Sequence, residues 1–179
     1  PQLILKMNSE ILKEGGEALI AAAVVIFLLL LIDFRRLLPA TLAAIPLVAG
    51  ITWMLLIAWA VGMKYNFVNL IAVPVMVGIG VDDGVHFIHR YLQEGPGRLR
   101  VTAMGVGRAI IMTSLTTMIG FGNVIFYTHR GTASLGAALV IGVGSCLAAT
   151  LIILPPLAHV FTGRLFRHQA HKPGKEVVT

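Results

Sequence analysis

The chain has 179 residues, of which 57% are hydrophobic and only 12% are charged, and its mean hydropathy is +0.88. Soluble domains carry roughly 25% charged residues, so this chain cannot cover a water-facing surface unless most of its outside faces lipid. This composition excludes a soluble enzyme, a disordered tail and a disulfide-rich secreted module. The single cysteine, Cys146, lies in an apolar run and has no partner for an internal disulfide, so it is expected to be a small packing residue.

Five apolar stretches follow one another along the chain, and a helix needs about 20 residues to cross a bilayer. They predict an all-α integral membrane fold, a five-helix transmembrane bundle, because lipid leaves no water for unpaired backbone groups and the stretches lack the alternation of barrel strands. Pro155 and Pro156 are expected to break the last helix near its end. The predicted order is a periplasmic or interfacial lead-in over 1–16, a bundle over 17–161 with helices at 17–32, 37–61, 67–89, 108–127 and 132–157, and a cytoplasmic basic tail over 162–179.

The basic residues are divided unequally between the two ends of these helices. Ten of them fall in the connections at one end and in the tail: Arg35, Arg36, Arg90, Arg98, Arg100, Arg108, Arg164, Arg167, Lys172 and Lys175. The other end holds four: Lys6, Lys13, Lys64 and Arg130. The positive-inside rule therefore predicts a membrane protein with its C-terminus in the cytoplasm and its N-terminus on the opposite side. The net charge of +6 forms no dense basic stripe with interleaved aromatic residues, which excludes nucleic-acid binding.

Two adjacent acids, Asp82 and Asp83, follow an almost wholly apolar run in the third predicted helix. A charged Asp at the bilayer centre costs ~2.5–3.5 kcal/mol, so such a residue is a functional candidate that faces protein or a water-filled path. Burial and the neighbouring carboxylate both favour the protonated form, so this pair could take up and release a proton near neutral pH. In the alternative, the helix leaves the membrane at Val81 and the acids lie among the headgroups. The apolar run that continues over 84–88 argues against it.

Residues close to the acids could assist them or simply pack. His86 lies four residues after Asp82 and three after Asp83, so it could share a face with either, as a relay member or as a pairing partner. Small residues predict close packing between helices in a membrane, and this helix has three glycines there: Gly78, Gly80 and Gly84. Pro74 is expected to kink or loosen the same helix.

The fourth predicted helix carries four hydroxyl side chains: Thr113, Ser114, Thr116 and Thr117. Each could hydrogen-bond a carboxylate on the neighbouring helix, or could bond back to a carbonyl of its own helix, as Ser and Thr commonly do. The fifth helix has Ala138, Gly142 and Cys146 at four-residue spacing, which predicts a smooth face for helix packing.

Three segments carry a family resemblance: GIGVDDGVHFIHRY over 78–91, TSLTTMIGFG over 113–122 and LIILPP over 151–156. They resemble the last membrane helices of RND-superfamily exporters of the MMPL and hopanoid-transporter kind, and the likeness extends over about 17–161. The resemblance implies a multi-pass protein of the bacterial cell inner membrane, with this chain's N-terminus on the periplasmic side. It also implies twelve membrane helices in two six-helix repeats, each with a large periplasmic domain after its first helix. The five helices here would be helices eight to twelve, part of one six-helix repeat.

The resemblance also implies roles for residues of this chain. In the family an acid on helices four and ten takes part in proton relay, and Asp82 matches its position. Many MMPL proteins have tyrosine directly after that acid, whereas this chain has Asp83, which leaves open which of the two carries the proton. The hydroxyl-rich helix of the family packs against the acid helix, and its matching residues here are Thr113, Ser114, Thr116 and Thr117. The chain is expected to be a fragment that does not transport alone, with the first repeat, helix seven and the periplasmic domains as its partners.

Together with the two membrane acids, the resemblance implies a proton-motive-force-driven exporter of hydrophobic or lipid-like substrates, and not an enzyme. Protons are expected as the coupling ion, with no cofactor, no metal site and no catalytic residue. Membrane lipids and the substrate are the expected ligands, and a homo-oligomer is compatible with the sequence. A non-transporting, sterol-sensing-like or scaffold membrane domain is the alternative. An ATP-driven pump lacks its GxxxxGK[ST] loop here, and an intramembrane aspartyl protease needs two acids on facing helices rather than on one.

Overall fold

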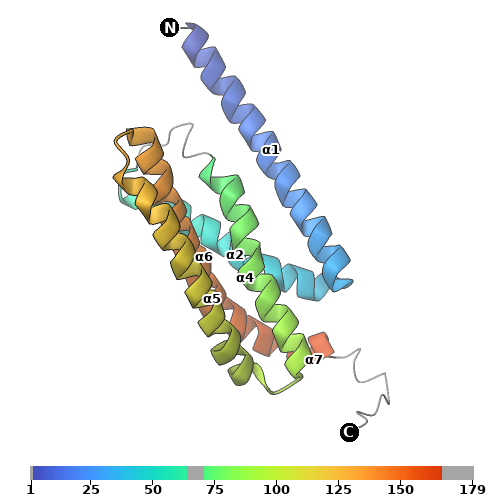
Figure 1. Ribbon diagram of the computed structural model, residues 1–179. Helices are drawn as coiled ribbons and strands as arrows, with labels where there is room; N and C mark the ends of the chain where they lie inside the picture. Colours follow the sequence, from blue (N-terminus) through green and yellow to red (C-terminus); the bar gives the residue numbers. More distant parts are fainter. Residues whose placement is uncertain (1, 64–70, 167–179) are drawn as a thin grey trace.

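The computed structural model describes residues 2–63 and 71–166, shown in Figure 1. Over this part of the chain the regular structure is helical and contains no strand, so the predicted all-α fold is confirmed. The elements are α1 (Gln2–Phe34), α2 (Leu37–Ala60), α4 (Ala72–Glu94), α5 (Leu99–Gly122), the 3-10 helix η1 (Asn123–Phe126), α6 (Arg130–Val160) and α7 (Thr162–Phe166). The predicted start of the third helix at residue 67 and the basic tail from residue 167 onward lie outside the described residues.

Three of the described helices are long and apolar enough to cross a membrane: α2, α5 together with η1, and α6. The first, α1, runs unbroken over 33 residues, but its apolar part is the shorter stretch Ile20–Phe34. Helix α4 is less apolar because its second half carries both acids and several further polar residues. Helix α5 begins at Leu99, well before the predicted residue 108, because residues 99–108 contain no proline that would interrupt a helix.

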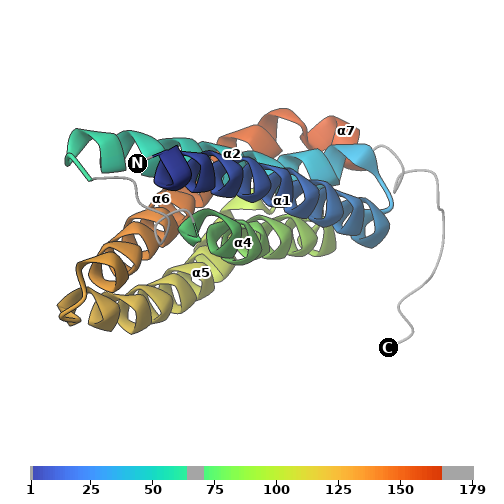
Figure 2. The ribbon, with the colours of Figure 1, turned by 90° about the horizontal axis from the view of Figure 1, so that it is seen from above.

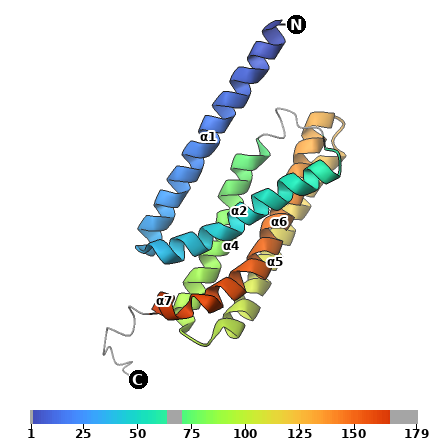
Figure 3. The same cartoon turned by 180° about the vertical axis from the view of Figure 1, so that it is seen from behind.

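Two expectations about prolines were wrong. Helix α6 does not break at Pro155 and Pro156 but runs on to Val160, and Figure 3 shows its last part turning toward α7. A proline bends a membrane helix rather than ending it when neighbouring helices hold both halves in place. Pro74 does not kink α4, because the helix begins at Ala72 and the proline lies in its first turn. Backbone N–H groups there have no partner within the helix in any case.

Helices α2, α4 and α6 pack against one another, and α5 lies along α4 and α6. Figure 2, seen from above, shows α4 between α1 and α5. Figures 1 and 3 show the N-terminal part of α1 standing away from the other helices. The C-terminal part of α1 joins the core through Leu30 and Phe34, both buried. The arrangement therefore leaves one long side of α4 facing α5.

Helices α2 and α4 both pack closely against α6 at Cys146. A Cβ atom added to Gly50 of α2 would lie 2.5 Å from Cys146 Sγ, and one added to Gly80 of α4 would lie 2.8 Å from it. Real Cβ atoms do not approach other atoms so closely, so only glycine fits at either position. Cys146 is buried and unpaired, which confirms its predicted role as a small packing residue.

The last turn of α4 is fixed to the end of the bundle by Tyr91. Its hydroxyl lies 2.6 Å from Thr162 Oγ1, and its ring meets the ring of Phe166 edge-on at 5.4 Å. The Thr162 hydroxyl donates its only proton to the carbonyl oxygen of Ala158, 2.9 Å away. Tyr91 is therefore the donor in the Tyr91–Thr162 hydrogen bond. This buried contact holds α4 against α6 and α7.

Candidate functional site

The two predicted acids line one groove between α4 and α5, which has a volume of about 750 Å³. Asp82 is exposed in it, and Asp83, the next residue, is partly buried. Consecutive residues of a helix point about 100° apart, so the two carboxylates face different parts of the groove. The acids therefore lie within α4, beside α5, and at a distance from the connection that follows Glu94.

The groove brings together most of the residues singled out in the sequence. Its polar lining from α4 is Asp82, Asp83, His86, His89, Arg90, Gln93 and Glu94. From α5 it is Thr102, Thr113, Ser114 and Thr117, and the apolar lining is Ile79, Val101, Gly105, Val106, Ala109 and Ile110. Of the four predicted hydroxyl residues only Thr116 lies outside the groove. Its hydroxyl donates instead to the carbonyl oxygen of Met112.

Of the four predicted hydroxyl side chains, that of Ser114 lies beside Asp83, and those of the three threonines bond to carbonyl oxygens of their own helix. Ser114 is buried, and its hydroxyl approaches the Asp83 carboxylate, to which it can donate a hydrogen bond. The hydroxyl of Thr117 donates to the Thr113 carbonyl oxygen at 2.9 Å, and that of Thr113 donates to the Ile110 carbonyl oxygen at 3.0 Å. Like Thr116, these two residues follow the alternative in which threonine bonds back to its own helix.

The two histidines of α4 have different surroundings. His86 lines the groove and lies close enough to Asp83 to interact with its charge. His89 Nε2 lies 2.6 Å from Asp33 Oδ2, and its ring stacks on Phe34 at 4.4 Å between centroids. Both partners of His89 come from the last residues of α1. His89 therefore ties α1 to α4, while His86 remains directed to the groove.

The polar lining continues beyond the acids in a way that sequence reasoning missed. Arg90 Nη2 lies 2.6 Å from Glu94 Oε1, and Arg98 Nη1 lies 3.5 Å from Glu94 Oε2. From the sequence, Arg90 and Arg98 were assigned only to the basic connections between helices, and Glu94 was not singled out. The signal that could have found them is their spacing, because Asp83, His86, Arg90 and Glu94 follow one another at intervals of three and four residues.

The three predicted packing glycines differ in what surrounds them. A Cβ atom on Gly84 would collide with the carbonyl oxygen of Ala43 on α2, and one on Gly80 would collide with Cys146. Gly78 has open space at the same position, so it takes no part in close packing. Gly142 of α6 meets the Met76 side chain of α4 in the same close manner. The helix that carries the acids thus meets the backbone of α2 at Ala43, and packs against α6 where a glycine of one helix accepts a side chain of the other.

The chemistry available in the groove is proton binding by carboxylates and imidazole, with a hydroxyl donor beside one carboxylate. No group of three or more His, Cys, Asp or Glu side chains within residues 2–63 and 71–166 is arranged to hold a metal ion. The site therefore consists of Asp82, Asp83, His86 and Ser114, with the polar end of α4 beyond them.

Several known proteins are similar in sequence to this chain. The chain is 31% identical to the hopanoid transporter HpnN of Rhodopseudomonas palustris (strain TIE-1) over 157 residues, which cover 88% of this chain and 18% of that protein. It is 28% identical to the hopanoid transporter HpnN of Burkholderia multivorans over 157 residues, with the same two shares. It is 34% identical to the human protein dispatched homolog 3 over 100 residues, 52% of this chain and 7% of that protein.

The chain spans less than a fifth of the length of these two bacterial relatives. No solved structure matches it significantly. The three long apolar helices, together with the likeness to named transporters, identify a membrane protein. The MMPL family matches residues 3–177, nearly the whole chain. As the acid and hydroxyl segments implied, the chain belongs to the MMPL family.

Proposed function

We propose that the chain is part of a proton-driven exporter of hydrophobic or lipid-like molecules, in which Asp82 and Asp83 bind and release the coupling proton. The observation that carries the proposal is the shared groove between two helices, which both acids line together with His86 and Ser114, with Asp83 beside the Ser114 hydroxyl. Acids within a membrane are costly and are kept where they face protein or water. The lipid-like substrate class is supported by the two relatives named as hopanoid transporters. In this role the chain moves protons and performs no covalent chemistry.

Asp83 links protonation to the contact between α4 and α5. When charged, its carboxylate accepts a charge-assisted hydrogen bond from Ser114, and such bonds are roughly twice as strong as neutral ones. A proton on Asp83 weakens this bond and removes the charge that keeps water in the groove. The α4–α5 contact then has two states of different strength, and α4 shifts against its neighbours as the proton binds and leaves. In the complete transporter this shift drives substrate movement in the periplasmic parts.

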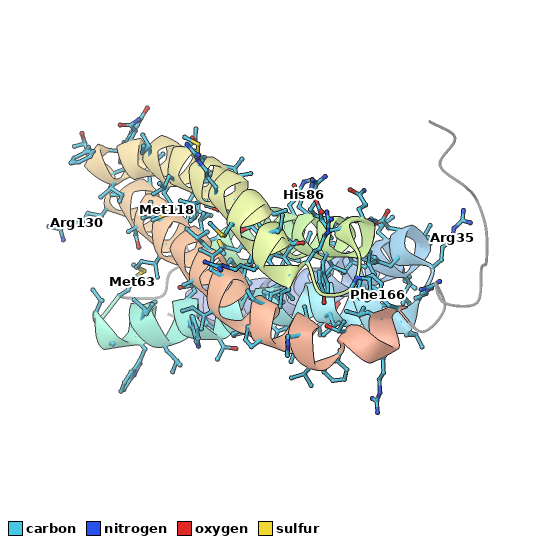
Figure 4. All side chains as sticks on the ribbon, turned by 90° about the horizontal axis from the view of Figure 1, so that it is seen from below. Arg35, Met63, His86, Met118, Arg130 and Phe166 are labelled. Carbon is cyan, nitrogen blue, oxygen red and sulfur yellow. The ribbon has the colours of Figure 1, made fainter. Side chains whose placement is uncertain are left out.

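The direction of the proton follows from the charges at the two ends of the bundle. Figure 4 shows Arg35 and Phe166 at one end and Met63 and Arg130 at the other. Most of the basic residues belong to the Arg35 end, which the positive-inside rule assigns to the cytoplasm. A proton that enters from the periplasm and leaves at the Arg35 end would run down the proton-motive force of an inner membrane.

The test is export by the full-length transporter carrying Asp82→Asn, Asp83→Asn or both. We expect each single variant to insert normally and to lose export, because asparagine cannot exchange a proton. Asp33→Asn is the matched control, since Asp33 lies next to the last residue of α1, pairs with His89 and does not itself line the groove. Undiminished export by both single variants and by the double variant would overturn the proposal. If such variants also change conformation on binding a sterol-like ligand, the non-transporting alternative is favoured.

A further inference from the structure

A second groove lies between α1 and α2, the two helices that are joined by Arg35 and Arg36. Its volume is about 440 Å³, which is within the range of pockets that hold small molecules. Figure 3 shows the two helices spreading apart from their connection. We call this the α1–α2 groove, and its lining is Phe27 of α1 with Thr41, Ala44, Ile45, Val48 and Ala49 of α2. None of these residues lines the groove that holds the acids.

The lining of the α1–α2 groove is apolar. Thr41 is its one residue with a polar side chain, and the Thr41 hydroxyl donates to the Leu38 carbonyl oxygen 2.9 Å away. A buried water molecule needs about two to four polar partners, and no side chain of this lining is free to supply one. The Val48 side chain is exposed, so the groove is open along one side. The groove is therefore suited to a hydrocarbon chain rather than to water or a polar solute.

The length of the α1–α2 groove matches one leaflet of a bilayer. Phe27 lies eight residues before Arg35, and Val48 lies twelve residues after Arg36. At 1.5 Å of rise per residue, these separations are about 12 and 18 Å along the two helices. Half of a hydrocarbon core of ~30 Å is about 15 Å. An acyl chain whose headgroup lies level with the two arginines therefore reaches the far end of the groove.

Two arginines without partners lie where the headgroup of such a lipid would be. Arg35 and Arg36 are both exposed, and neither has an ion-pair or hydrogen-bond partner among the side chains that the structure describes. Figure 4 shows Arg35 at the outer edge of this end of the bundle. The acid nearest along the chain, Asp33, is bound to His89 at 2.6 Å, and the first turn of α2 has no acidic side chain. The positive charge at this end of the groove is therefore available to an anion.

The backbone of Arg35 has a conformation that does not favour arginine. Its φ angle is +51°, in the left-handed region that glycine adopts with less strain. Among the described residues, no other residue except glycine has a positive φ angle. Glycine would make this turn more easily, so what arginine adds here is its side chain.

We propose that the α1–α2 groove binds an anionic phospholipid, with an acyl chain along the groove and the phosphate at Arg35 and Arg36. Arginine binds phosphate through paired N–H groups, and basic residues beside a membrane helix attract anionic lipids. The basic tail does not fit this site, because its Arg167, Lys172 and Lys175 carry the same charge as the two arginines. The site goes beyond the proposed function and does not rest on it, since α1 and α2 form it without the acids of α4.

The experiment is photocrosslinking in the full-length transporter, with p-benzoylphenylalanine in place of Phe27. The protein is reconstituted into vesicles of phosphatidylglycerol and phosphatidylcholine in equal amounts, and each lipid is labelled in turn. An arginine near the surface strengthens the binding of an anionic lipid about fivefold. We therefore expect a preference of about 25-fold for phosphatidylglycerol, about fivefold in Arg35→Gly or Arg36→Gln, and none in the double variant. The same probe at Ile152, an exposed apolar residue of α6 that lines neither groove, should show no preference.

Matched variants separate this site from general effects of charge and of folding. Arg35→Gly fits the positive φ angle, so a loss of binding in it cannot come from a strained turn. Arg164→Gln removes one exposed charge from α7 and should leave the preference unchanged. Thr41→Phe fills the groove and should abolish the crosslink to phosphatidylglycerol, whereas Thr52→Phe should not. Both threonines are exposed on α2 and bond back to their own helix, but only Thr41 lines the groove.

Three results would overturn the site. The first is an equal yield of the two lipids at Phe27 in the parent protein, and the second is a preference that survives the double variant. If the double variant does not insert, Arg35→Gly decides, and an unchanged preference in it overturns the site. The third is a crosslink from Phe27 to another segment of the transporter, because a protein segment then fills the groove. Export does not enter this test, so the lipid site stands even if Asp82→Asn and Asp83→Asn still export and the proton relay falls.

Discussion

Replacing Gly84 by alanine tests how closely α4 packs on α2. The added Cβ atom would collide with the carbonyl oxygen of Ala43, which is backbone and cannot rotate away. The two helices must therefore move apart. Gly78→Ala is the matched control, because Gly78 lies on the same helix and has open space around it. Both variants add the same methyl group, so the difference between them isolates the contact with Ala43.

The expected magnitudes follow from two opposing effects. Alanine favours a helix interior over glycine by about 1 kcal/mol. Overpacking costs ~1–3 kcal/mol, and the rigid backbone partner places Gly84 at the upper end of that range. We therefore expect Gly84→Ala to lower the free energy of unfolding by about 2 kcal/mol and Gly78→Ala to raise it by up to about 1 kcal/mol. Asp83 is the neighbour of Gly84, so export should fall with Gly84→Ala as well.

The assay is denaturation of the purified full-length transporter by SDS in mixed micelles, followed by the helical circular dichroism signal. Gly84→Ala should unfold at a lower SDS fraction than the parent protein, and Gly78→Ala at the same or a higher one. Equal unfolding midpoints for the two variants would refute the close contact between α4 and α2.

Two further predictions concern single hydrogen bonds. Ser114→Ala should lower export, because it removes the hydroxyl beside Asp83, whereas Thr116→Ala should leave export near the parent level because that hydroxyl bonds only to its own helix; equal export by the two variants would count against a role for Ser114. Thr162→Val leaves the buried Tyr91 donor without an acceptor and should cost ~1–3 kcal/mol, more than the ~0.5–1.5 kcal/mol expected for Tyr91→Phe. SDS denaturation measures both, and the reverse order would contradict the donor assignment.

The sequence was sufficient to predict the helical fold and one part of the groove, namely the two acids, His86 and the hydroxyl residues of α5. These are local signals: acids in an apolar run, hydroxyls at helical spacing and the lengths of the apolar runs. The structure brings Asp83 of α4 beside Ser114 of α5. The sequence could not tell which hydroxyl, that of Ser114 or of a threonine, lies beside the acid. Ser114 and Thr113 are adjacent, and which of them faces α4 depends on how α5 is rotated about its axis. The structure fixes this rotation through packing on α6.

Contacts between segments far apart in the sequence could not be predicted either, because they too depend on how the helices pack against one another. His89 and Asp33 are 56 positions apart, and nothing in either segment indicates the other. Gly78 and Gly84 have the same side chain and lie on the same helix, yet only Gly84 meets another backbone. Pro74 was expected to kink the helix because the start of α4 at Ala72 could not be located within a continuous apolar run.

The crossing of α2, α4 and α6 at Cys146 also determines how α4 can move. Gly80 lies directly against the Cys146 side chain, so α4 can tilt at this point but cannot slide along it without forcing atoms together. Glu94 lies about 21 Å along the helix from Gly80, and Asp83 only about 4.5 Å, at 1.5 Å of rise per residue. A tilt about Gly80 therefore displaces Glu94 about five times as far as Asp83. If α4 tilts about this crossing, a small displacement at Asp83 is accompanied by a larger one at Glu94.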